Sequence, residues 1–308
     1  MKSLPLIFAL IYITLGNVKA QNQDAFPDFA PNKKDTILPW EMDDSVFTIQ
    51  RKLFQTASKH LCQGDTIGAI SLLEQYVKEF PKNVYIKTVK VRLGQLYTDL
   101  GNLSTAETIL NSVLETLNND EGFLFEVQSV GNCPPIIQGL FYPTKTNSNA
   151  CIALNEIAMK RKNYKKALDY LVLSETKYFP STECGNGSDM MKMMIEERFI
   201  KYFLTIGDTS SAIKRAMENL FISSQSNVIL LRQLLLRNHT EKEVFDEVEK
   251  AISNVYFVKK SNENRIETPF SLFEYSINNL GRVYFSDVRE LRESLKKDRI
   301  FQILKTGQ

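Results

Sequence analysis

A helix pair recurs along the chain from residue 45 onward and restricts the chain to a helical fold. In the first pair, apolar residues recur with a period near 3.6 over residues 46–62 and again over 66–79. Gly64-Asp65 separates the two stretches, and a link this short fits only an antiparallel helix hairpin. Pro81 then ends the second helix, because proline has no amide hydrogen to donate within a helix.

Three further stretches repeat this arrangement, with turns at Gly101-Asn102, Asn163-Tyr164 and Gly207-Asp208. The turn residues are types that accept a left-handed backbone. Each second helix also carries a small residue that lets two helices approach closely; these are Ala69, Ala106, Ala167 and Ala212. The distance between successive turns varies along the chain, so the repeats are degenerate.

At these residues the chain resembles the tetratricopeptide repeat family, whose units pair a large-small-aromatic first helix with an alanine-bearing second helix. The second pair fits the pattern best, at Leu93, Gly94, Tyr97, Gly101, Ala106 and Leu110. Asn155 and Ile200 stand where the family has a small residue. The resemblance covers residues 45–222 and implies an all-α, helix-hairpin (TPR-like) solenoid. A generic helical bundle is the alternative.

The first twenty residues predict a signal peptide. Met1-Lys2 supplies a positive start, Leu4–Leu15 is an apolar run, and Ala20 offers a small residue before a cleavage point at Gln21. The run is too short to span a bilayer, and no later stretch approaches that length, so we expect no integral membrane span after leader cleavage. The chain is therefore expected to be exported, to a bacterial periplasm or outside the cell. An uncleaved anchor is the alternative.

Residues 21–44 predict a proline-containing linker, with Trp40 at its end expected to cap the first helix pair. Two loops interrupt the repeats, a long excursion at 118–147 and a shorter loop at 181–189. Residues 223–308 predict non-repeat C-terminal helices that pack on the solenoid. Thr240 and Glu243 predict a capping box there, and residues 288–300 predict a final amphipathic helix.

Charge argues against two classes of partner. The net charge of +2 comes from Lys2 and Lys19, the only charges in the leader, so the exported chain is neutral. A neutral chain has no electrostatic reason to bind nucleic acid or an anionic membrane.

The sequence holds no assembled set of catalytic or metal-binding residues. Its two histidines, His60 and His239, are not spaced as a ligand pair, and no CxxC or phosphate-binding glycine loop occurs. The carboxylate pair Glu196-Glu197 predicts a solvated helix face. We therefore expect no catalytic residue, no metal and no cofactor.

The four cysteines allow several pairings in an exported protein. Cys62 and Cys151 lie within first helices, which predicts free, buried thiols. Cys133 and Cys184 lie in loops that follow the second helices of consecutive pairs, so we expect a Cys133–Cys184 disulfide. A Cys133–Cys151 disulfide and four free thiols are the alternatives.

The resemblance also implies a binding surface, because in that family the first helices line a concave groove. The polar groove residues would be Arg51, Gln95, Asp99, Glu156, Lys160, Glu197 and Lys201. Their neighbours on this face would be Phe54, Ser58, Thr88, Val91, Asn149, Ile152 and Met159. The mixed signs suit a peptide or protein better than phosphate. The alternative is that the C-terminal helices or the 118–147 excursion close this face.

Three functional hypotheses follow from these patterns. The first is a non-catalytic, exported helical-repeat protein that binds a protein or peptide partner in the bacterial envelope. The second is an exported enzyme or small-ligand binder with its site under the 118–147 excursion, near Tyr142, Tyr164 and Tyr202. The third is a structural unit that dimerises through its C-terminal helices.

Overall fold

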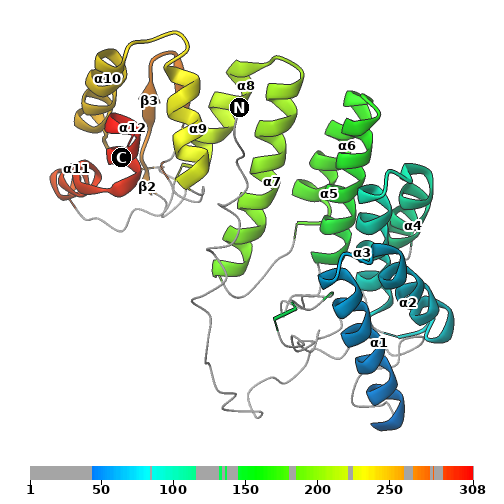
Figure 1. Cartoon of the computed structure of the whole chain (residues 1–308). Helices are drawn as coiled ribbons and strands as arrows, with labels where there is room; N and C mark the ends of the chain where they lie inside the picture. Colours follow the sequence, from blue (N-terminus) through cyan, green and yellow to red (C-terminus); the bar gives the residue numbers. More distant parts are fainter. Residues whose placement is uncertain are drawn as a thin grey trace. The chain divides into compact units, whose positions relative to one another are not determined.

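Four helix hairpins make up the first part of the computed structural model (Figure 1). The hairpins are α1 (Asp44–Cys62) with α2 (Thr66–Glu79), α3 (Ile86–Asp99) with α4 (Leu103–Glu115), α5 (Lys145–Lys160) with α6 (Tyr164–Thr176), and α7 (Gly185–Thr205) with α8 (Thr209–Glu218). The structure describes residues 44–83, 85–115, 132–133, 136, 145–179, 185–220, 225–259, 266–277, 280 and 287–307. The predicted signal peptide, the predicted linker up to residue 43 with Trp40, and most of the excursion lie outside these residues. Asp44, predicted in the linker, begins α1, and residues 145–147, predicted in the excursion, begin α5. The all-α, TPR-like hairpin fold is confirmed.

The four hairpin turns share one backbone geometry. Gly64, Gly101 and Gly207 have left-handed φ angles of 80°, 79° and 83°. The residue after each donates its N–H back across the turn at 2.8 to 2.9 Å, as in a Schellman motif. The same residue caps the second helix by accepting from a backbone N–H three positions ahead, and these caps are Asp65, Asn102, Asn163 and Asp208.

In the third turn the left-handed residue is Lys162, with φ 57°, and not Asn163 as predicted. Asn163 is one position later and serves as the cap, with its side chain accepting from Lys166 N at 3.2 Å. The cap position therefore fixes which residue must take the left-handed conformation, even where no glycine is present.

Small residues allow the paired helices to touch. Ala69, Ala106, Ala167 and Ala212 are all fully buried, as predicted. A Cβ on Gly94 would lie 2.5 Å from Leu110 Cγ, so only glycine fits between α3 and α4. Asn155 is buried where a small residue is usual, and its amide donates to Ala167 O at 3.0 Å. This hydrogen bond satisfies the polar group inside the hairpin.

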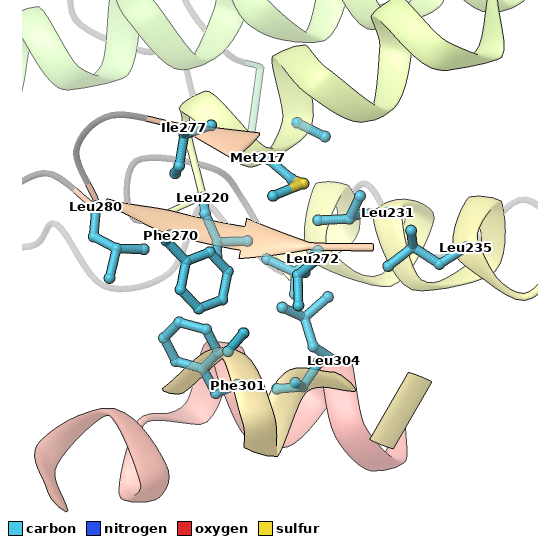
Figure 2. Packing of buried hydrophobic residues seen from close by; sticks show 14 of the residues in the cluster. Met217, Leu220, Leu231, Leu235, Phe270, Leu272, Ile277, Leu280, Phe301 and Leu304 are labelled. Carbon is cyan, nitrogen blue, oxygen red and sulfur yellow. The ribbon is translucent and has the colours of Figure 1, made fainter. Parts of the chain in front are cut away.

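The C-terminal part is built from helices and two short hairpins. It contains α9 (Gln225–Leu235), α10 (Glu241–Asn254), β1 (Val258–Lys259), β2 (Ile266–Glu267), β3 (Phe270–Leu272), β4 (Tyr275–Ile277), α11 (Val288–Lys297) and α12 (Arg299–Thr306). β1 pairs with β2 and β3 with β4, both antiparallel. One apolar cluster joins α8 and α9 to β3 and α12 through residues such as Met217, Leu231, Leu272 and Phe301 (Figure 2). The Thr240–Glu243 capping box opens α10 as predicted.

Three details differ from the sequence-based expectation. Residues 270–277, expected within a helical region, form a hairpin, because Phe270 and Leu272 alternate with exposed Ser271 as strand residues do. The final helix divides at Asp298, which caps α12 by accepting from Ile300 N at 2.8 Å. The loop predicted at 181–189 is shorter, because α7 begins at Gly185.

Among the described residues, none of the helices is long and apolar enough to cross a membrane.

Candidate protein-binding surface

The first helices of the second, third and fourth pairs lie side by side, because α3 packs on α5 and α5 on α7. Polar side chains connect them across the surface. Lys160 Nζ donates to Thr98 O at 3.0 Å, joining α5 to α3. Glu156 lies 3.6 Å from both Lys160 Nζ and Arg198 Nη1, so it joins α5 to α7. We call the surface that carries Gln95, Glu156, Lys160, Arg198, Glu197 and Lys201 the first-helix face.

A cleft of about 350 Å³ lies where α7 meets α9, at the end of this face. Its walls combine two charged residues, two neutral polar residues and three aliphatic residues: Glu197, Lys201, Thr205, Asn227, Ile200, Leu204 and Leu230. Glu197 and Lys201 are exposed and one helical turn apart. The volume is at the small end of ligand sites, enough for one or two amino-acid side chains. The lining suits a peptide that presents an apolar side chain between polar groups.

Most of the predicted groove residues fall into three groups, and the remaining ones, Thr88, Asn149 and Met159, are half-buried. Glu156, Lys160, Glu197 and Lys201 lie on the first-helix face together with Gln95, which accepts from Arg92 Nη1 at 3.3 Å. Asp99 is exposed at the end of α3, and Arg51 is exposed on α1. Phe54, Ser58, Val91 and Ile152 are buried and therefore do not line an open surface.

The sequence does not single out Arg198, because this residue joins the first-helix face only through its ion pair with Glu156 in another helix. The sequence gives it no special spacing, and only the packing of α7 against α5 brings its guanidinium to Glu156. Interhelical ion pairs of this kind have no local sequence signal.

The two neighbouring glutamates of α7 differ in how far they are exposed to solvent. Glu197 is exposed as predicted, but Glu196 is only 1% exposed, which corrects the prediction of a solvated pair. Arg215 Nη1 donates to Glu196 Oε1 at 3.1 Å and holds Glu175 through two bonds of 2.8 Å. Glu196 Oε2 is buried and makes no hydrogen bond. Burial therefore raises the pKa of Glu196 to about 7, although Arg215 partly opposes the shift.

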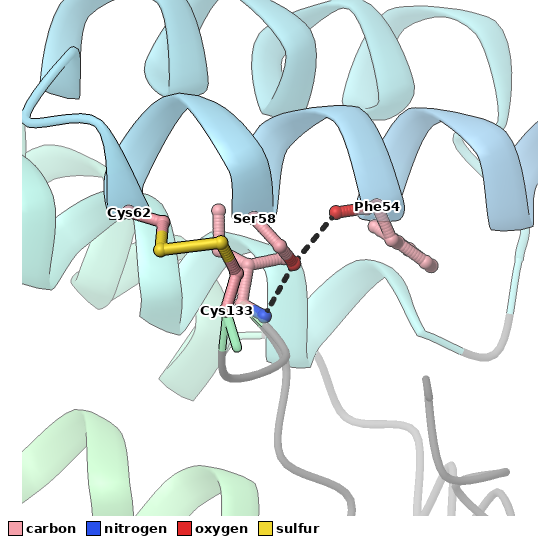
Figure 3. Close-up of a disulfide and its surroundings, with 5 residues drawn as sticks. Phe54, Ser58, Cys62 and Cys133 are labelled. Atoms are coloured by element: carbon pink, nitrogen blue, oxygen red, sulfur yellow. Dashed lines mark hydrogen bonds between the residues drawn. A yellow bond between two sulfur atoms is a disulfide. The ribbon is translucent and has the colours of Figure 1, made fainter. Parts of the chain in front are cut away.

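The cysteine pairing differs from the expected one. Cys133 forms a disulfide with Cys62, with Cα atoms 5.5 Å apart, so the Cys133–Cys184 and Cys133–Cys151 pairings are wrong (Figure 3). The predicted free thiol at Cys62 is also wrong, because the excursion returns to α1. Cys151 is a buried free thiol as predicted, and burial raises its pKa to about 12. Cys184 lies outside the described residues.

The site proposed for an enzyme is only partly described. Tyr142 lies outside the described residues, Tyr164 is half-buried, and Tyr202 packs in an apolar cluster with Phe199. Within the described parts of the chain, no three His, Cys, Asp or Glu side chains gather in a way that could hold a metal ion.

The comparison with known families agrees with this geometry. The tetratricopeptide repeat family model matches residues 61–123, which include α2, α3 and α4. These hairpins are TPR-like. The match covers less than half of the chain, and the TPR-like turn geometry continues beyond it through α5–α8. TPR-like repeats generally mediate protein–protein interaction and are typically non-catalytic. Among the curated proteins compared with this chain, none matches it.

Proposed function

We propose that this chain is an exported, non-catalytic protein that binds a protein partner along the first-helix face in the bacterial envelope. The observation that carries the proposal is the cleft between α7 and α9, which continues a row of packed first helices. Its three aliphatic lining residues supply apolar area to bury, and the exposed Glu197 and Lys201 supply charges of both signs. A partner segment with one apolar side chain between polar groups fits this lining.

Export is supported by the order of positive start, apolar run and small residues in residues 1–20. The test is expression of the full chain in a Gram-negative host with a C-terminal tag, followed by fractionation and N-terminal sequencing. We expect periplasmic protein that begins at Gln21, and cytoplasmic protein when residues 2–20 are deleted. Full-length protein retained in the membrane would contradict export with cleavage.

Partner binding is tested with two aspartate substitutions on α9. Leu230 lines the cleft, whereas its neighbour Ile229 is 41% exposed and does not. Leu230→Asp places a charge among the aliphatic lining residues, so we expect retention of an envelope partner to fall by about fivefold or more, as at an interface hot spot. Ile229→Asp is the matched control and should retain the partner. Equal retention by two folded variants would place binding elsewhere.

A further inference from the structure

One polar side chain in the wall of the α7–α9 cleft lacks a hydrogen-bond partner. Asn227 lies in the first turn of α9, lines the cleft and is only 7% exposed. Its amide nitrogen Nδ2 is buried, and no described residue accepts a hydrogen bond from it. Such a donor is costly to bury, because it has lost its hydrogen bonds to water. An acceptor on a bound molecule would restore the missing bond.

The packing of the cleft wall does not require this amide. The residues beside Asn227 include Ile200, Leu204 and Leu230, so an aliphatic side chain would suit the wall without a buried donor. The amide can turn toward a bound molecule, because the last torsion of an asparagine side chain has broad, roughly two-fold minima. Turning exchanges the places of the nitrogen and the oxygen, so Nδ2 comes within reach of the cleft.

The charges of the cleft favour a neutral acceptor. Glu197 and Lys201 lie one helical turn apart on α7, and their charges cancel. A free carboxylate would be attracted by Lys201 but repelled by Glu197. A main-chain carbonyl carries no charge and recurs at every residue of a polypeptide. The charge balance therefore favours the interior of a partner chain over its carboxyl end.

The acceptor also restricts the conformation of the partner. In an α-helix nearly every main-chain carbonyl is already bonded within the helix, except in the last turn. An extended segment leaves its carbonyls free and places successive side chains on opposite sides. One aliphatic side chain can therefore enter the cleft while a neighbouring carbonyl meets Asn227.

We propose that the α7–α9 cleft binds an internal, extended segment of the partner protein, in which one aliphatic side chain enters the cleft and an adjacent main-chain carbonyl accepts from Asn227 Nδ2. This inference rests on the binding role proposed above and names the chemistry of the segment that is bound. Asn227 is then the residue that selects a main-chain acceptor, and the aliphatic lining residues select the side chain.

Nuclear magnetic resonance with a short neutral probe tests the proposal. The probe is acetyl-Gly-Leu-Gly-amide, which has one aliphatic side chain, several main-chain carbonyls and no charge. It is added at about millimolar concentration, where a ligand of this size binds, to the isotope-labelled chain purified after export. We expect the side-chain amide proton signals of Asn227 to shift as the hydrogen bond forms. The signals of Asn238, an exposed asparagine beyond the end of α9, should stay in place.

Substitutions at Asn227 test the donor. Asn227→Leu keeps the branched shape of the side chain, Asn227→Ala leaves extra space, and neither variant can donate. We expect each to bind the probe about fivefold or more weakly, because each lacks one hydrogen bond to the ligand. The shifts of the α9 backbone amides report the affinity, and urea unfolding checks the fold. Asn238→Leu is the matched control and should bind as the unsubstituted chain does.

The outcomes separate this proposal from the proposed function. Unchanged affinity in both folded Asn227 variants would overturn the proposal, and the binding role would stand if Leu230→Asp still loses the envelope partner. Acetyl-Gly-Leu-Gly with a free carboxylate should bind no more tightly than the amide, and tenfold tighter binding would show that the cleft selects a chain end. No shift at any cleft residue would also overturn the proposal. The binding role itself would fail only if Leu230→Asp retained the partner.

Discussion

At the scale of single residues, the buried carboxylate of Glu196 gives the clearest prediction. Its pKa is about 7 in the folded chain and near 4.5 in the unfolded chain, so between these values the folded state holds the extra proton. The free energy of unfolding should therefore fall as pH rises from about 4.5 to about 7, by at most about 1.4 kcal/mol per pH unit from this group, and should level off above that range. Glu196→Gln should remove that part of the slope, as measured by urea unfolding at each pH.

The control for this prediction is the adjacent residue. Glu197 is exposed, so Glu197→Gln should keep the slope of the wild-type chain. A slope that is unchanged in Glu196→Gln would mean that Glu196 titrates normally in the folded state. In that case Arg215 would stabilise the charged carboxylate by as much as burial destabilises it.

The same two residues show where sequence reasoning stops. Both are glutamates on one helix, and neither composition nor spacing distinguishes them. The difference comes from Arg215 and Glu175, which lie on α8 and α6 and meet Glu196 only after the helices pack. A buried charge cluster of this kind is a tertiary property.

At the scale of elements, the hairpin turns are predictable because their determinants are local. A left-handed residue followed by Asp or Asn recurs in all four turns, and glycine supplies it in three of them. The exception gives a test, because a non-glycine residue in this conformation is strained by roughly 1 kcal/mol or more. Lys162→Gly should therefore stabilise the chain by up to about 1 kcal/mol in urea unfolding.

The matched control for that substitution is an exposed lysine in the following helix. Lys165 lies in α6, where glycine adds unfolded-state entropy without relieving strain. Lys165→Gly should destabilise the chain by about 0.5–1 kcal/mol. If Lys162→Gly destabilises it equally, the turn does not hold Lys162 in the left-handed region.

Packing inside a hairpin gives a second prediction at this scale. A Cβ at Gly94 would collide with the branch point of Leu110, which cannot move aside as the end of a flexible chain can. Gly94→Ala should therefore destabilise the chain by about 1–3 kcal/mol. The effect should shrink in a Leu110→Ala background, and an additive double-mutant cycle would exclude this contact as the cause.

Unlike the turns of the helix hairpins, the two C-terminal β-hairpins are not predictable from the sequence, because the residues that determine them are far apart along the chain. Phe273 has φ 53°, a conformation that a bulky residue rarely adopts. Its ring stacks on His239 at 3.6 Å, and its N–H donates to Glu247 at 3.2 Å. These partners come from α10 and the turn before it, so the short sequence around Phe273 does not reveal the turn.

At the scale of the whole molecule, the Cys62–Cys133 disulfide is the longest covalent constraint among the described residues, with a sequence separation of 71. Closing so long a loop restricts the unfolded chain, so Cys62→Ser with Cys133→Ser should lower the free energy of unfolding by about 2–4 kcal/mol. Non-reducing peptide mapping should recover the two cysteines in one linked fragment. A Cys133–Cys184 fragment would restore the pairing expected from the sequence.

The sequence pattern predicts the repeats, but it does not predict the Cys62–Cys133 pairing. A pattern of local spacings cannot show which helix a residue in a long excursion contacts. The sequence placed the loop with Cys133 on an edge beside the loop with Cys184. Burial of Ile136 against the first hairpin instead brings Cys133 back to α1. Ile136 also packs in the cluster of Phe54, and both Phe54 and Ser58 are buried. The predicted groove is therefore closed at α1, whereas a cleft is present between α7 and α9.

Site-specific photocrosslinking tests whether a partner binds the first-helix face. A benzophenone amino acid is placed at Lys201, beside the cleft, and in a second chain at Lys214, an exposed lysine on α8. After irradiation of living cells, we expect a discrete adduct with one partner protein from position 201 and none from position 214. Adducts of equal yield at both positions, or an adduct from position 214 alone, would show that the partner does not bind the first-helix face.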